Sequence, residues 1–153
     1  MRLTLSKMKT SDLLEMELRE RDLDMLSSMD DWLGKLWEAL NKGYGFTIYH
    51  EDEVVACIGI TNIVTGVAEI WAITGVLVDK YPKDFHKTCQ RIIDYAFEID
   101  NLHRLQCTAE ASFDKTIKWL ENLGFEREGV LRNYTPDKKD MCIYAMLDNK
   151  EVS

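Results

Sequence analysis

The sequence predicts a mixed α/β (α+β) fold, in which one sheet combines an antiparallel meander with a parallel strand–helix–strand crossover. Apolar residues recur at helical spacing in several segments, most clearly in an amphipathic helix expected over 84–99. Extended stretches between 44 and 78 are separated by short turns, which is typical of a meander. The helix at 84–99 joins two extended stretches, and such a crossover makes the flanking strands parallel and right-handed.

The N-terminal third is predicted to be mainly helical. Ser11 is the expected N-cap of an acidic helical region, because a serine hydroxyl accepts a bond from the first helical turn. From Tyr44 the apolar period becomes that of strands, and VVACIGI at 54–60 is typical of a strand covered on both faces. In chain order, the expected elements are a strand at 2–5, two helices within 11–28 that separate near 21–22, a helix at 30–40, and strands at 46–49, 54–60 and 68–78.

The C-terminal half is predicted to add a final helix and a closing hairpin. Asp114 or Ser112 would cap the helix, which runs to Asn122. Gly124 would end it, because glycine accepts the left-handed conformation of a helix C-terminus. The strands expected here are 105–109, directly after the crossover helix, and a hairpin of 125–134 and 141–147 across the turn at 136–139.

The composition is that of a globular protein. The 153 residues are 46% apolar and 30% charged, and this length predicts one domain spanning 1–153. The formal net charge of −8 disfavours binding to nucleic acid, which needs a basic surface, and suits a cationic substrate. No run approaches the roughly 18 apolar residues of a membrane span, and no signal-peptide pattern begins the chain. We therefore expect a cytoplasmic protein without a membrane partner.

The four cysteines are predicted to be reduced thiols in the core. Cys57, Cys89, Cys107 and Cys142 each lie within an apolar segment. No C-x-x-C pair or Cys/His pair has the spacing of metal ligands, and the three histidines are scattered on expected turns. The sequence therefore predicts a reducing compartment and no metal.

Three segments of the second half carry a family resemblance. They are DYAFEIDNLHRLQ at 94–106, TIKWLENLGFEREGVLRNY at 116–134 and DKKDMCIYAML at 137–147. Together with the order of elements, they resemble the GNAT acyltransferases, in particular the ribosomal-protein-alanine acetyltransferase branch. Phe113, Trp119 and the IWAITG stretch also resemble acetyltransferase-like proteins of tailed phages and prophages. The resemblance covers about 44–147, and the N-terminal third fits only by element order.

The resemblance implies that acetyl-CoA binds as a cosubstrate in the gap where the two parallel strands diverge. The pantetheine arm would pair with the strand edge as an added strand does. The pyrophosphate would bind at the turn before the helix, where the family has Gln/Arg-x-x-Gly-x-Gly/Ala, because backbone N–H groups must approach phosphate closely. The implied residues are Val76, Leu77 and Val78 for the arm, Lys80, Lys83, Asp84, Phe85, His86 and Lys87 for the turn, and Phe113 at the position of a cofactor-contacting asparagine.

The turn departs from this family pattern. Both glycine positions carry bulky residues, and Pro82 between them removes one N–H donor. Lysine side chains would then replace part of the attraction for phosphate. Three lysines within eight residues, at 80, 83 and 87, are equally an ordinary solvated turn.

Two carboxylates are the candidate general bases. Direct acyl transfer needs a base for the ammonium, a donor for the thioester oxygen and an acid for the leaving thiolate. Glu69 begins the strand that enters the gap, close to where many family members have a base, and Glu110 follows the parallel strand. The alternatives are a solvent-facing strand residue for Glu69 and a loop charge near a helix N-terminus for Glu110.

Hydroxyl groups are the candidate acids. Many family members have a tyrosine acid where this chain has Leu120, so that acid is missing. Thr116 lies at the position of a serine suggested as the acid in the alanine-acetyltransferase branch. Ser112 and Tyr134 are further hydroxyl donors, and their alternative roles are a helix cap and a hairpin surface residue.

Two functions remain open at this point. The first is an N-acetyltransferase that moves an acetyl group from acetyl-CoA to an amine of a small molecule or protein, by direct transfer in a ternary complex. The second is a catalytically inactive GNAT-fold protein of a phage or prophage, acting in the host cytoplasm as a binding or virion-associated component. Exposed strand edges also allow a homodimer.

Overall fold

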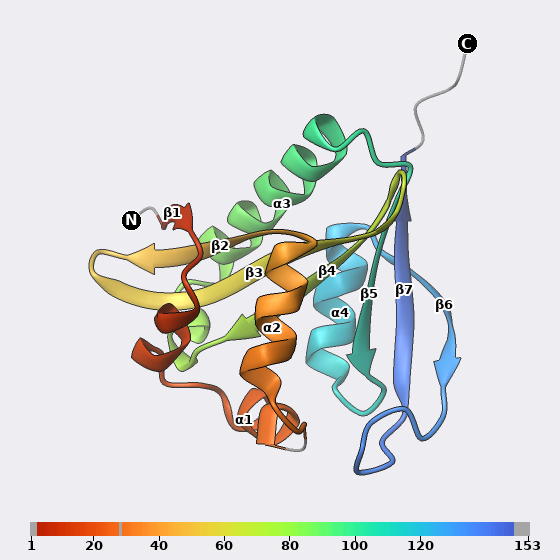
Figure 1. Ribbon diagram of the computed structural model, residues 1–153, viewed down its shortest axis with the longest axis horizontal. Helices are drawn as coiled ribbons and strands as arrows, with labels where there is room; N and C mark the ends of the chain where they lie inside the picture. Colours follow the sequence, from red (N-terminus) through yellow and green to blue (C-terminus); the bar gives the residue numbers. More distant parts are fainter. Residues whose placement is uncertain (1–2, 28, 149–153) are drawn as a thin grey trace.

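A seven-stranded mixed sheet organises the computed structural model, which describes residues 3–27 and 29–148 (Figure 1). The strands are β1 (Thr4–Lys7), β2 (Gly43–His50), β3 (Glu53–Val64), β4 (Val67–Thr74), β5 (Arg104–Glu110), β6 (Glu126–Leu131) and β7 (Met141–Leu147). The helices are α1 (Glu20–Ser27), α2 (Trp32–Asn41), α3 (Pro82–Ile99) and α4 (Asp114–Leu123), with 3-10 helices η1 (Thr10–Glu15) and η2 (Val76–Lys80). The strand order is β1-β2-β3-β4-β5-β7-β6. Only the β4–β5 pair is parallel among these strands, which confirms the predicted meander, crossover and hairpin.

Helices cover both faces of the sheet (Figure 1). Each face has its own apolar cluster. The first cluster contains the inward residues of α3 and α4, such as Phe85, Ile92 and Leu120. The second contains Leu26 of α1 and Leu36 of α2. Residues of β3 belong to both clusters, which confirms that the VVACIGI stretch is covered on both faces.

The start of η1 differs from the prediction. Ser11 lies inside this 3-10 helix and is not its N-cap. The helix begins at Thr10, and its N-cap is Lys9. The N–H of Lys9 donates to the Asp12 carboxylate at 3.0 Å. The buried Asp12 also accepts from the Thr47 hydroxyl at 2.7 Å, so a contact with β2 decides where η1 begins.

The helical region also breaks earlier than predicted. Residues 16–19 are not helical, whereas the break was expected near 21–22, because Leu18 forms an antiparallel bridge to Gly75. The strand expected at 2–5 is found as β1, with position 2 outside the described residues. The expected end near 28 also lies outside them. The helix expected at 30–40 is α2, and the Asp31 carboxylate accepts the N–H of Gly34 at its start.

The strand expected at 68–78 is shorter than predicted. Thr74 ends β4, and Val76–Lys80 forms η2. The N–H of Gly75 donates to the Val55 carbonyl of β3 at 3.0 Å, and the N–H of Val78 donates back to the Gly75 carbonyl at 3.2 Å. These bonds turn the chain out of the sheet, and apolar composition alone gave no sign of the turn.

The remaining boundaries shift by a few residues. α3 begins at Pro82 rather than 84, since proline suits the first helical position. α4 begins after Phe113, so neither Ser112 nor Asp114 is its N-cap. Gly124 has φ +107° and ends α4, as predicted. Of the strand expected at 125–134, only Glu126–Leu131 forms, as β6. The chain then turns in the loop to β7, where Asn133 has φ +52°. None of the described helices is long and apolar enough to cross a membrane.

Candidate functional site

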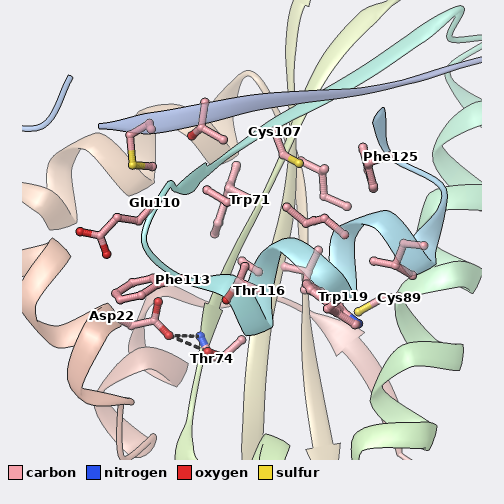
Figure 2. Close-up of a pocket in the computed structure, with 18 of the residues that line it drawn as sticks. Asp22, Trp71, Thr74, Cys89, Cys107, Glu110, Phe113, Thr116, Trp119 and Phe125 are labelled. Carbon is pink, nitrogen blue, oxygen red and sulfur yellow. Dashed lines mark hydrogen bonds between the residues drawn. The ribbon is translucent and has the colours of Figure 1, made fainter. Parts of the chain in front are cut away.

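The two parallel strands diverge soon after they meet. β4 and β5 pair only from Val67 to Glu69 and from Arg104 to Gln106. Beyond these residues a cavity of about 180 Å³ opens between the strands and α4 (Figure 2). Asp22, Glu110 and Phe113 lie at one end of the cavity, and Cys89 and Phe125 lie at the other. The predicted gap therefore exists and is large enough to hold part of a ligand.

The middle of the cavity is walled by two tryptophans. The indole N–H of Trp71 donates to the Thr61 hydroxyl at 3.0 Å. Its ring covers Gly59, where an added Cβ would lie 2.0 Å from a ring carbon, so this close approach requires glycine. Trp119 of α4 stacks on Phe85 of α3, with ring centroids 5.5 Å apart. These contacts hold both the sheet wall and the helix wall of the cavity.

Asp22 is a buried carboxylate on the cavity wall. It is 9% exposed, and its Oδ2 accepts from the Thr74 N–H at 3.2 Å and from the Thr74 hydroxyl at 2.5 Å (Figure 2). A carboxylate removed from water is stable only when such donors satisfy it. Asp22 therefore joins α1 to the last residue of β4, at the end of the cavity that contains Glu110.

The segment 17–19 covers only the end of the free edge of β4, at Thr74 and the residues that follow it. The N–H of Arg19 donates to the Thr74 carbonyl at 3.3 Å, and the N–H of Val76 donates to the Glu17 carbonyl at 2.9 Å. The Arg19 guanidinium also pairs with Asp79 in η2. The segment thus occupies backbone groups at the edge on which Val76 was expected to bind the donor arm.

Glu110 lies where two cavities meet. Its carboxylate is 3.4 Å from the Lys139 ammonium, which is also 3.4 Å from Asp137. A second, open cavity of about 560 Å³ shares Glu110, Phe113 and Lys139 with the first. Its other lining residues are Arg19, Glu20, Asp24, Ser112 and Lys115. A carboxylate at such a junction has access to ligands from both sides.

Glu69 lies at the apex of the gap and lines neither cavity. Burial raises the pKa of its carboxyl above the ordinary value. Burial, together with the nearby Glu69 charge, raises the pKa of the Cys107 thiol to about 12. Cys89 has its pKa raised by burial as well, and all four cysteines are buried free thiols, as predicted.

The predicted hydroxyl donors separate in the structure. Thr116 lines the main cavity, and Ser112 lines the open one. Tyr134 is 60% exposed in the β6–β7 loop and lines neither. Phe113 lines both cavities, so the structure brings it together with Glu110, Ser112 and Thr116.

The predicted phosphate site is a cationic helix start. Lys80, Lys83 and Lys87 are exposed at η2 and the first turns of α3, with Asp84 and His86 half-buried beside them. Phe85 is 3% exposed, and its N–H donates to the Tyr81 carbonyl at 2.9 Å. Since Pro82 has no N–H, the first turn offers phosphate at most the N–H groups of positions 83 and 84. Leu77 and Val78 lie in η2, and neither lines a cavity.

Sequence reasoning missed Asp22, Thr74 and Lys139. A signal for Asp22 exists, because it is four residues from both Leu18 and Leu26 and so interrupts an apolar helical stripe with a carboxylate. Lys139 had no signal, since its place depends on how the β6–β7 loop folds back. Within 3–27 and 29–148, no group of His, Cys, Asp or Glu has the arrangement of a metal site.

Comparisons with known proteins agree with this architecture. No protein-family model matches the chain. An uncharacterized N-acetyltransferase p20 of Bacillus licheniformis is 33% identical over 110 residues, which are 68% of this chain and 61% of that protein. The chain thus spans about three fifths of the length of this curated relative.

Solved structures show the same fold. A GNAT-family acetyltransferase of Bacillus anthracis has a TM-score of 0.73 at 19% identity, covering 98% of this chain and 97% of its own. A ribosomal-protein-alanine acetyltransferase of Vibrio fischeri has a TM-score of 0.70 at 17% identity, covering 98% and 95%. A variant of the spermidine N-acetyltransferase SpeG of Vibrio cholerae has a TM-score of 0.70 at 20% identity, covering 95% and 94%. The chain has the fold of the GNAT acetyltransferase superfamily and is similar in sequence to an N-acetyltransferase. The predicted resemblance is confirmed at this level.

Proposed function

We propose that this GNAT protein is an N-acyltransferase that moves an acyl group from acyl-CoA, in the simplest case acetyl-CoA, to an amine. The observation that carries the proposal is the position of Glu110, at the junction of an apolar cavity between diverging strands and an open cavity. A donor in the first cavity and an acceptor in the second would meet beside this carboxylate. We infer that 1–153 forms one acyltransferase domain, and a cytoplasmic location and a homodimer stay predictions.

The chemistry needs one base and one acid. Glu110 takes a proton from the acceptor ammonium, and the amine nitrogen attacks the thioester carbonyl carbon. The new C–N bond forms as the C–S bond breaks, and a hydroxyl gives its proton to the leaving thiolate and takes in its place the second proton that the attacking nitrogen loses. Thr116 is the hydroxyl placed to supply that proton, because it lines the donor cavity, whereas Ser112 faces the acceptor side. In this proposal Glu69, which lies at the apex of the gap, is not the base.

The donor would bind through lysines and a strand edge. Lys83 and Lys87 on the first turns of α3 provide the positive charge for pyrophosphate, with two N–H groups in place of a glycine-rich turn. The pantetheine arm would pair with Ile70 and Ala72 of β4, which line the cavity and have no partner residue on β5. Val76 is less suited, because its N–H already donates to Glu17.

The acceptor would be a cationic amine. Glu20 and Asp24 line the open cavity, lie four residues apart on α1 and form no ion pair with a described side chain, whereas the lysines of that cavity are paired. An ammonium entering the cavity would meet these carboxylates before Glu110.

The turn without glycines favours the alternative, a GNAT-fold protein that has lost donor binding and acts as a phage or prophage binding component.

Acetyl-CoA binding decides between these two functions. A ligand at 100 times its Kd stabilises the native state by about 2.7 kcal/mol, which raises Tm measurably. We expect such a shift at millimolar acetyl-CoA, and its loss in Lys83→Glu with Lys87→Glu at unchanged circular dichroism. Lys35→Glu with Lys42→Glu, on the α2 side, is the matched control and should keep the shift. A wild-type protein without any shift favours the inactive alternative.

Turnover then tests the base. Once an amine acceptor is found by screening for CoA thiol release, Glu110→Gln should keep the acetyl-CoA shift and lose about 10²- to 10⁴-fold in kcat. Glu69→Gln serves as the comparison, because Glu69 lines neither cavity and its variant should retain turnover. If Glu69→Gln loses as much turnover as Glu110→Gln, the assignment of the base is wrong.

A further inference from the structure

One lysine lies against the proposed base. The Lys139 ammonium is 3.4 Å from the carboxylate of Glu110, whose side chain is only 13% exposed. Among the lysines within 3–27 and 29–148, Lys139 alone lines the main cavity, and it lines the open cavity as well. Lys139 therefore occupies the place that the proposed mechanism gives to the ammonium of an acceptor, at the junction of the two cavities.

The β6–β7 loop holds the backbone of this lysine beside β5. The N–H of Lys139 donates to the Thr135 hydroxyl at 2.8 Å, within the loop. The carbonyl of the next residue, Asp140, accepts the N–H of Ala111 at 3.0 Å, directly after Glu110. The position of Lys139 beside Glu110 is thus built into the fold of the loop, and its side chain does not reach the carboxylate by chance.

The ion pairs of Lys139 leave its amine able to react, provided that a base is present. The second partner is Asp137 at 3.4 Å, and the side chains of this pair are 46% and 45% exposed. Exposed pairs of this kind contribute little to stability, so breaking one costs little. The bonds to Asp137 and Glu110 raise the pKa of Lys139 above its ordinary value, so the amine must lose a proton before it attacks. Glu110 is the carboxylate placed to take that proton.

We propose that Lys139 is a modification site, at which the protein acylates itself within one molecule when an acyl-CoA donor is in the main cavity. This inference rests on the proposed acyltransferase function and adds an acceptor that belongs to the chain. The ammonium gives one proton to Glu110, and the nitrogen attacks the thioester carbonyl carbon. The C–N bond forms as the C–S bond breaks, and the second proton of the nitrogen passes to the thiolate, so CoA leaves as a thiol. The product is a neutral amide that no longer pairs with Glu110.

Mass spectrometry of the full chain after incubation with acetyl-CoA tests the proposal. A Glu-C digest keeps Lys138 and Lys139 in one peptide, and its fragments assign the acetyl group to one of them. Lys138 is the internal control, because it is exposed and lines neither cavity. Lys139 should be acetylated about 10²-fold faster than Lys138 or more, the lower end of what a positioned base contributes. Equal rates would show direct reaction with acetyl-CoA from solution and would overturn the proposal.

Variants and dilution test the geometry. Glu110→Gln should lose the fast acetylation of Lys139 while it keeps the acetyl-CoA shift in Tm. Lys139→Arg should lose the fast gain of one acetyl group in the mass of the whole protein, and Lys138→Arg is the matched control that should keep it. The rate should not change when the protein is diluted, because transfer within one molecule is unimolecular. Wild-type acetylation of Lys139 in Glu110→Gln, or a rate that falls on dilution, contradicts the proposal.

Donor binding separates this inference from the proposed function. If acetyl-CoA raises Tm while Lys138 and Lys139 react alike, the modification site is wrong and the proposed function stands. If Tm does not shift and the two lysines react alike, both proposals fail. Fast acetylation of Lys139 that persists in Lys83→Glu with Lys87→Glu supports the modification site and contradicts only the proposed phosphate site.

Discussion

Of the side chains at the site, Asp22 is the one whose loss should lower the free energy of unfolding most, because it bonds Thr74 twice. Asp22→Ala removes the acceptor of two Thr74 donors, the N–H at 3.2 Å and the hydroxyl at 2.5 Å. Asp22 and Thr74 are 9% and 7% exposed, so water does not replace the lost partner freely. The variant therefore leaves two buried donors unsatisfied and frees α1 from the end of β4.

The magnitude follows from these two bonds. A hydrogen bond to a charged group contributes about 1.5–3 kcal/mol, so Asp22→Ala should lower the free energy of unfolding by about 3–5 kcal/mol. Thr74→Val removes only the hydroxyl donor and should cost about 1.5–3 kcal/mol. Asp22→Asn keeps an acceptor oxygen and should cost less than Asp22→Ala. Whole domains have only about 5–15 kcal/mol of net stability, so these differences are large.

Urea unfolding of the wild type, Asp22→Ala, Thr74→Val and the double variant measures the coupling free energy between the two side chains. The coupling between Asp22→Ala and Thr74→Val should be at least about 1 kcal/mol, because residues in one hydrogen-bond pair are not additive. The reasoning fails if Asp22→Ala costs under about 1 kcal/mol or if the two effects simply add. Glu20→Ala, on the same helix in the open cavity, is the control and should change stability little.

Two further predictions concern β4 and the glycine that follows it. Gly75→Ala would place a Cβ 2.6 Å from Met16 Cγ and 3.1 Å from the Glu17 carbonyl, and should destabilise by about 1–3 kcal/mol and speed exchange of the Arg19 amide, measured by hydrogen exchange. Normal protection of Arg19 in that variant would show that 17–19 docks without this contact. Burial raises the pKa of Glu69, so the folded state loses stability as pH rises through the range above the ordinary value of 4.5. Glu69→Gln should therefore stabilise at pH 7 and lose this advantage below pH 4.5; an equal gain at both pH values in urea unfolding contradicts the assignment.

Much of the architecture followed from period and turn chemistry. The apolar run of β3, the glycine that ends α4 and the amphipathic face of α3 are local signals, and each led to the correct element. Boundaries failed where a distant contact decided them. Asp12 bonds to β2 and thereby fixes η1, and Gly75 turns the chain out of β4 through Val55. Neither partner is near in sequence, so no local pattern encodes these contacts.

The site was predictable only in part, for the same reason. Glu110 ends β5, whereas Phe113 and Thr116 lie at the start of α4, and the parallel crossover places such residues at the gap. Glu69 has the expected place on β4, yet the cavity begins beyond it, because pairing with β5 lasts through that residue. Asp22 enters from the N-terminal helices, whose packing over the sheet has no signature in spacing alone.

The two ends of the donor site place unequal demands on the sequence. At the phosphate end, bulky residues replace glycines and Pro82 removes a donor, so backbone amides contribute little and exposed lysines are screened by salt. Along β4, the mostly apolar cavity offers the pantetheine arm burial that salt does not weaken. If the proposed function holds, binding energy has moved from the pyrophosphate toward this arm. A turn without glycines is then compatible with catalysis, because the donor is held mainly by its arm.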